Sequence, residues 1–188
     1  MCIRDRPNTG EIVFFDRSWY TRALVEATMG YCTKRQYTYF MKNVIPWEKK
    51  QIEEGVEFFK FYLSIEKNTQ QKRIDKRATS PLVYWKISEN DLKMLDKWDA
   101  FTLYKEQMFK RTSYDEAPWI VLNANNKKVA ILSALRFILN AFDYPDKDLP
   151  KPKIWSEGLN NYKVEINKVL FENLSYQQYK TLRVFADE

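Results

Sequence analysis

The stretch Glu11-Ile-Val-Phe-Phe-Asp16 is a short apolar run that ends abruptly in a carboxylate. Two similar runs follow at residues 56–65 and 119–123, and glycine or proline stands directly before each of the three. None of them alternates strictly between apolar and polar residues, which is typical of strands buried on both faces of a parallel sheet. The three runs therefore predict the strands of the fold.

Helical patterns separate these runs. They cover residues 33–51, where Pro46 is expected to kink or split the helix, residues 88–111 and residues 125–142. Ser88-Glu-Asn-Asp91 forms the capping box of the second helix, and Ile131, Leu135, Ile138 and Phe142 form one face of the third. Strands that alternate with helices predict an α/β fold with a parallel sheet and right-handed crossovers.

The tail differs in character from the rest. Pro145, Pro150 and Pro152 suggest a stiff connector, and residues 164–185 are predicted to be a helix. Its apolar stripe would dock on the core or on a neighbouring subunit, and it consists of Ile166, Val169, Leu170 and Leu174.

Composition excludes several classes of function. The 188 residues carry a net charge of +6 and contain no histidine, which rules out histidine-based triads, metal sites and proton shuttles. Cys2 and Cys32 make neither a disulfide framework nor a zinc site, so we expect a reduced, cytoplasmic protein. No stretch is apolar enough to span a membrane, and no nucleic-acid recognition module is present.

Asp16 is the first candidate for chemistry. A carboxylate at the carboxyl end of a buried strand lies at the ligand-binding edge of an open α/β sheet. There it can hold Mg²⁺, directly or through water, and the adjacent Arg17 can clamp a phosphate oxygen. An aspartate that only begins the turn after a strand, with no role in chemistry, would give the same sequence pattern.

The second candidate is a cationic helix. Between residues 67 and 86, six basic residues stand against one acid. Lys72, Arg73, Lys76 and Arg77 share one helical face, where like charges repel one another. Such a face is either solvated or built for an anion. Ser80-Pro81 ends this helix, and Trp85-Lys86 follows.

Lys105 is the third candidate. It occupies the apolar face of the helix over residues 88–111, in register with Met94, Trp98, Phe101 and Met108. A lysine in such a stripe either extends its amine to solvent or points into a cleft. Taken together, the three signals indicate Mg²⁺-dependent handling of phosphates.

The ordered motifs resemble the family-2 polyphosphate kinases. They run from Gly10-Glu-Ile-Val-Phe-Phe-Asp-Arg-Ser-Trp-Tyr20 through Met29-Gly-Tyr-Cys-Thr33, residues 70–77, Trp85-Lys-Ile-Ser88, Trp98-Asp99, Arg111-Thr112 and Ala117-Pro118-Trp119. The resemblance covers residues 10–144, with a lid at about 66–90, and leaves residues 1–9 and 145–188 outside it.

The resemblance implies a P-loop kinase-like, three-layer α/β/α fold with a parallel sheet and a helical lid. It implies Mg²⁺-dependent phosphoryl transfer between inorganic polyphosphate and a nucleotide, ADP/ATP foremost and GDP/GTP or AMP as further candidates, in a homo-oligomer. Asp16 and Arg17 match the family's catalytic Asp-Arg pair, with Asp16 as the metal ligand. Arg73 and Arg77 match the lid arginines and Lys86 the lysine after the lid tryptophan, whereas Lys72 stands where the family often has arginine. The residues expected to bind polyphosphate or nucleotide are Lys72, Arg73, Lys76, Arg77, Lys86 and Lys105.

One departure from the family is large. The sequence contains no G-x-x-x-x-G-K-[ST] phosphate loop, and only ten residues precede Glu11, where the family places that loop and a central strand. We therefore expect an N-terminally truncated fold with exposed sheet edges, poor solubility and little or no activity of this chain alone. Two alternatives stay open: a non-catalytic polyanion-binding remnant, and an ATP-dependent nucleoside monophosphate kinase.

Overall fold

The computed structural model describes residues 7–147 and 162–186. The chain forms two compact units. The first unit falls within residues 1–58 and 89–112, and the second within residues 59–88 and 113–188. Residues 1–6 of the expected N-terminal extension lie outside the described residues, as do Pro150 and Pro152 of the expected connector.

The second unit contains a four-stranded sheet in the order β1-β2-β4-β3. β1 (Lys60–Ser64) pairs in parallel with β2 (Trp119–Asn123), which pairs in parallel with β4 (Val169–Leu174). β3 (Tyr162–Ile166) runs antiparallel to β4. The first four residues of β2 are buried, as expected of a strand that is covered on both faces. The strand predicted at 119–123 is confirmed, the run at 56–65 forms a strand over Lys60–Ser64, and the two pair in parallel as predicted.

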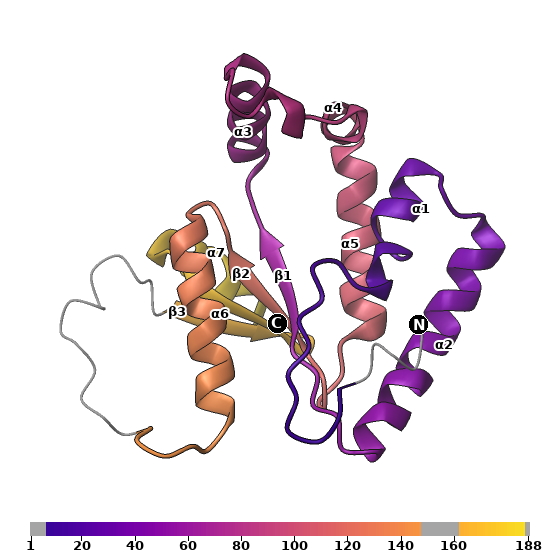
Figure 1. Ribbon diagram of the computed structural model, residues 1–188, viewed down its shortest axis with the longest axis vertical. Coiled ribbons are helices and arrows are strands. Elements are labelled where there is room, and N and C mark those ends of the chain that lie inside the picture. Colours follow the sequence, from indigo (N-terminus) through magenta and orange to yellow (C-terminus); the bar gives the residue numbers. More distant parts are fainter. Residues whose placement is uncertain (1–6, 148–161, 187–188) are drawn as a thin grey trace. The chain divides into compact units, whose positions relative to one another are not determined.

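The helices of this unit follow its strands. Figure 1 shows α3 (Lys67–Thr79) beyond the carboxyl end of β1, and η3 (Tyr84–Lys86) comes next. Ser80, the residue before Pro81, is extended and ends α3 where the sequence predicts. α6 (Lys127–Ala141) packs against β2 and β4, and α7 (Tyr176–Ala186) packs against β3 and β4.

The first unit is helical in its described part. It contains η2 (Trp19–Thr21), α1 (Val25–Met29), α2 (Lys34–Glu53), α4 (Glu89–Asp96) and α5 (Trp98–Thr112). Thr33 caps α2 with a reciprocal capping box: its hydroxyl accepts from the Gln36 amide, and the Gln36 side chain accepts from the Thr33 amide. α2 runs unbroken through Pro46, so the expected split does not occur.

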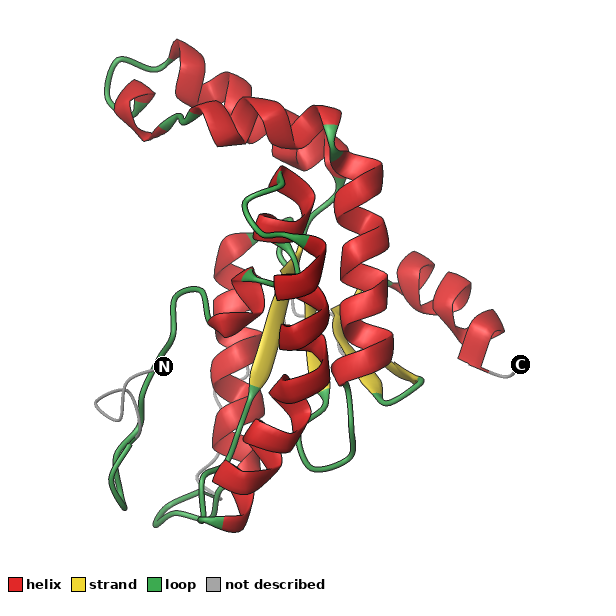
Figure 2. Ribbon diagram, turned by 90° about the vertical axis from the view of Figure 1, so that its right-hand side faces the viewer, coloured by secondary structure: helices red, strands yellow, loops and turns green. Residues whose placement is uncertain are grey.

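The predicted strand at residues 11–16 is wrong. Figure 2 draws this segment as a loop, and its side chains are exposed, with Ile12 at 71% and Phe14 at 76%. A strand exists only where a neighbour pairs its backbone amide and carbonyl groups. Among the described strands none pairs with this run, and β1 pairs only with β2, so β1 is an edge strand.

The predicted helix over residues 164–185 is also wrong in its first half, which forms the hairpin β3–β4. Asn167 and Lys168 between these strands have φ angles of 51° and 63°. Two consecutive left-handed residues match the twist of a two-residue hairpin turn and interrupt a helix. The apolar residues Ile166, Val169, Leu170 and Leu174 thus lie on strands, and only α7 is helical.

Two helical expectations need smaller corrections. The helix expected over residues 88–111 is divided at Lys97, whose amine donates to the carbonyl of Thr28 at 3.2 Å. The expected apolar face of α6 is largely open, because Ile131 is 60% and Leu135 is 47% exposed. In the described part of the chain, no helix is long and apolar enough to cross a membrane.

Candidate functional site

Asp16 and Arg17 lie in the loop that leads into η2, and both are exposed. Arg17 adopts a left-handed backbone conformation, with φ at 68°, which costs a non-glycine residue about 1 kcal/mol. The Ser18 hydroxyl then caps η2 by accepting from the Tyr20 amide at 3.3 Å. A strained residue of this kind persists only where the surrounding structure holds it in place, and such residues are common at functional sites.

Trp19 fixes this loop to α2. Its indole Nε1 donates to a carboxyl oxygen of Glu48 at 3.1 Å, and Glu48 is completely buried. The indole also packs edge-to-face against Trp47 and Phe58, with ring centroids 4.9 and 5.9 Å apart. The two residues after Arg17 are therefore anchored, which restricts where Asp16 and Arg17 can move.

Sequence reasoning missed Glu48, although a signal was present. The buried positions of α2 are Met41, Val44 and Glu48, at steps of three and four. An acid in register with the apolar stripe of a helix is expected to have a buried polar partner.

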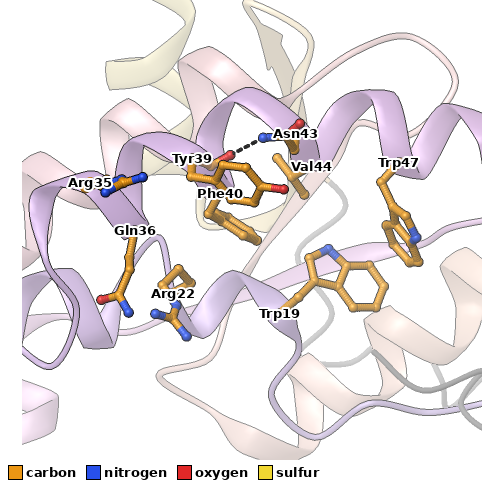
Figure 3. A pocket seen from close by; sticks show the side chains of 9 residues that line it. All are labelled: Trp19, Arg22, Arg35, Gln36, Tyr39, Phe40, Asn43, Val44 and Trp47. Atoms are coloured by element: carbon orange, nitrogen blue, oxygen red, sulfur yellow. Dashed lines mark hydrogen bonds between the residues drawn. The ribbon is translucent and has the colours of Figure 1, made fainter.

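An open pocket of about 600 Å³ runs along α2 beside this anchor, and sequence reasoning missed it as well. Figure 3 shows Arg22 and Arg35 toward one end of the pocket and Trp47 at the other, with aromatic side chains between them. Arg22 is already paired, since its Nε lies 2.8 Å from the Glu26 carboxylate. The pocket combines aromatic surface with positive charge.

Lys105 is half-buried on α5, in the apolar stripe of the helix. Burial lowers the pKa of its amine below the usual value of 10.5, and the nearby Glu106 carboxylate only partly opposes this. An anion close to this amine would oppose the effect of burial, because a negative charge stabilises the protonated form.

The cationic helix α3 forms as predicted, but its basic residues differ in their surroundings. Lys72 and Lys76 are exposed, whereas Arg73 and Arg77 are partly buried. The Arg73 Nη2 donates to the carbonyl oxygens of Ala124 and Asn125, at 2.7 and 2.9 Å, in the loop between β2 and α6. Arg73 is thus held by two backbone carbonyl oxygens just beyond the carboxyl end of β2.

Lys86 is the last residue of η3, and most of the residues around it in the sequence are exposed. Its amine lies 4.9 Å from the ring centroid of Trp85, which is 68% exposed. Leu82 and Tyr84 beside it are 83% and 61% exposed. A cation among exposed aromatic and aliphatic groups is a surface that a ligand would cover.

The predicted site residues fall into two groups. Asp16, Arg17 and Lys105 belong to the first unit, and Lys72, Arg73, Lys76, Arg77 and Lys86 belong to the second. The second group lies within one segment of the chain, because only residues 80–83 separate α3 from η3.

A model of the family described as Polyphosphate kinase 2 (PPK2) matches residues 2–150. The chain belongs to the polyphosphate kinase 2 family. Among similar proteins, the polyphosphate kinase PPK2B of Corynebacterium glutamicum is 42% identical over 161 residues, which cover 83% of this chain and 53% of that protein. A GDP-polyphosphate phosphotransferase of Pseudomonas aeruginosa is 44% identical over 146 residues, covering 78% of this chain and 41% of that protein.

A crystal structure of a polyphosphate kinase 2 from Arthrobacter aurescens TC1 is similar in fold. Its TM-score is 0.67 at 29% identity, and the match covers 79% of this chain and 54% of that one. The expected α/β fold of the polyphosphate kinase 2 family, with its mostly parallel sheet, is confirmed. The chain spans about half the length of the curated relatives it matches.

Proposed function

We propose that the protein supplies the cationic helix and the Asp16-Arg17 pair of a site that transfers a phosphoryl group between inorganic polyphosphate and a nucleoside diphosphate such as ADP or GDP. The observation that carries this proposal is α3, a helix with five basic residues that begins three residues after a parallel strand, in a chain of the polyphosphate kinase 2 family. Relatives named ADP-polyphosphate and GDP-polyphosphate phosphotransferases support the two substrate classes.

Mg²⁺ would be held by Asp16 in this proposal. Among the described residues no group of three or more acidic, cysteine or histidine side chains could form a metal cage. One exposed carboxylate nevertheless fits Mg²⁺, because this ion usually takes one or two carboxylates and completes its shell with water and substrate phosphates. When bound, the ion would supply neutralisation of the phosphate charge.

The remaining residues would bind and orient the substrates. Arg17 would clamp a phosphate oxygen beside Asp16, and the basic residues of α3 with Lys86 would hold the polyphosphate chain. Lys105 would meet a further phosphate, whose charge would offset the burial that lowers its pKa. Phosphoryl transfer needs placement and charge stabilisation more than covalent catalysis, so a site without histidine suffices.

We further propose that the 188 residues alone bind polyphosphate but do not turn it over. The sequence contains no G-x-x-x-x-G-K-[ST] phosphate loop to cradle a nucleotide phosphate, whereas the cationic helix is present. This combination favours the polyanion-binding remnant as the second candidate for this chain. A cytoplasmic homo-oligomer is part of the proposal, and sedimentation would test it: a strict monomer would contradict the homo-oligomer.

ATP formation from ADP, long-chain polyphosphate and Mg²⁺ tests the transfer. The chain is compared with its Asp16→Asn variant and with a hybrid in which the part of the Corynebacterium relative that precedes its match to this chain is placed before residue 10. We expect ATP from the hybrid only, and none from the hybrid that carries Asp16→Asn. A hybrid that is folded and inactive would refute the transfer. ATP from the chain alone would refute the need for the loop, and turnover only with ATP and a monophosphate would favour the kinase alternative.

A further inference from the structure

The loop between β2 and α6 is held by the C-terminal hairpin. β2 and β4 pair in parallel up to Leu122 and Glu172. One residue further, the Asn173 side chain continues the ladder: its Oδ1 accepts from the Asn123 amide at 2.7 Å, and its Nδ2 donates to the Asn123 carbonyl at 3.1 Å. Asn173 is 5% exposed. A buried side chain thus satisfies both backbone groups at the end of β2.

A residue of α7 also holds Asn123, through the Asn123 side chain. The Asn123 Nδ2 donates to the Gln178 Oε1 at 3.0 Å, and this oxygen also accepts from the Ser175 amide at 3.0 Å. The Gln178 amide in turn donates to the Ser175 hydroxyl at 3.2 Å. This is a reciprocal capping box at the start of α7, so the helix terminus and the loop share one acceptor.

The loop then holds α3 at two points. The carbonyl oxygens of Ala124 and Asn125 bind the Arg73 guanidinium, and the Asn125 Oδ1 accepts from the amide of Glu66, the residue before α3, at 3.0 Å. Asn125 is itself tied back to Asn123, because its amide donates to the Asn123 Oδ1 at 3.1 Å. The hydrogen bonds therefore run without a break from Asn173 to Arg73.

We propose that Asn173 is a positioning residue for the cationic helix: it holds Asn123 at the end of β2, and thereby shapes the loop that follows, so that this loop anchors α3 through Arg73. The family match ends at residue 150, and the segment that contains Asn173 follows it. The loop lies at the carboxyl end of β2, the edge where α/β sheets bind ligands. The importance of this positioning for polyphosphate rests on the proposed function.

Hydrogen exchange of the α3 amides tests the link without any ligand. Asn173→Gly removes both side-chain bonds, and glycine accepts the φ of 49° without strain. We expect faster exchange in α3 for Asn173→Gly and for Arg73→Ala, about fivefold in each. In the double variant, the increase in the exchange rate of α3 should be clearly smaller than the two single effects combined, because both substitutions act on the same contact.

Controls separate positioning from general loosening. Asp115→Asn removes the exposed ion pair with Lys168 at the other end of the hairpin and should leave α3 unchanged. Gln178→Ala removes the second hydrogen bond that holds the Asn123 side chain, and it replaces Asn173→Gly if that variant does not fold. It too should speed exchange in α3. Unchanged exchange in α3, or effects of Asn173→Gly and Arg73→Ala that simply add, would overturn the proposal.

Polyphosphate binding by the same variants then tests whether the position of α3 matters for binding. We expect Asn173→Gly to weaken binding by about fivefold, and to have little further effect once Arg73 is replaced. If the parent chain binds no polyphosphate while the exchange results hold, the proposed function fails and the positioning of α3 by Asn173 stands. Full binding by Asn173→Gly with α3 loosened would refute the role of this positioning in polyphosphate binding.

Discussion

Replacing Glu48 with alanine should loosen the loop that carries Asp16 and Arg17. Glu48 is completely buried and accepts the indole hydrogen of Trp19 at 3.1 Å. Removing one partner of a buried hydrogen bond, so that the donor is left unsatisfied, costs about 1–3 kcal/mol. Because Trp19 is only half-buried, water can reach part of it, so we expect a total loss of about 2 kcal/mol in the free energy of unfolding.

Urea denaturation, followed by tryptophan fluorescence and circular dichroism, measures this loss. Glu48→Gln keeps an oxygen that can accept from the indole, so it should cost less than about 1 kcal/mol. Glu53→Ala, an exposed acid at the end of the same helix, should change stability by less than about 0.5 kcal/mol. Equal stabilities for Glu48→Ala and Glu53→Ala would refute the idea that Glu48 anchors Trp19.

Three further predictions concern stability. Burial lowers the folded-state pKa of Lys105, so between that pKa and 10.5 the unfolded chain binds more protons than the folded chain, and stability rises with pH there. Lys105→Met should therefore raise the urea midpoint at pH 7, with a gain that shrinks toward pH 10.5, and a gain independent of pH would contradict this. Burial raises the pKa of Tyr62 to about 12, so the unfolded chain loses that proton first; Tyr62→Phe should lessen the fall in stability between pH 10 and pH 12, and the explanation fails if parent and variant fall equally. Thr33→Ala removes the α2 cap and should cost about 1 kcal/mol in thermal unfolding, whereas an unchanged midpoint would mean that the cap adds nothing.

Local signals predicted part of the fold well. The helix at residues 67–79 ends before Pro81 because the proline excludes helical backbone at Ser80, and that rule needs no distant partner. The strand at residues 119–123 was visible because it is apolar throughout and buried. These elements are specified by their own residues.

Non-local pairing explains the errors. Residues 11–16 have the composition of a strand, but a strand also needs a neighbour, and none of the described strands provides one. In the tail, the spacing of Ile166, Val169 and Leu170 suits a helix as well as a hairpin. The left-handed pair Asn167 and Lys168 decides between the two, and asparagine was the only local signal of it.

The candidate site was predictable in its charges and not in its supports. The basic residues of α3 and the Asp16-Arg17 pair stand out in the sequence by type and spacing. Glu48 and Asn173 support them across 29 and 50 residues of chain, through contacts with Trp19 and Asn123. No pattern within α2 or β4 names those partners, because only the folded chain brings them together.

Polyphosphate binding at several salt concentrations tests the central claim most directly, which is that the cationic helix binds the polyanion. The parent is compared with a variant that carries Lys72→Gln, Lys76→Gln and Arg77→Gln, and with a charge-matched control, Lys110→Gln, Lys163→Gln and Lys180→Gln. The account predicts affinity that falls steeply with salt, and a salt slope smaller by about 2–3 in the first variant only. Equal affinities and equal slopes for the two variants would contradict it.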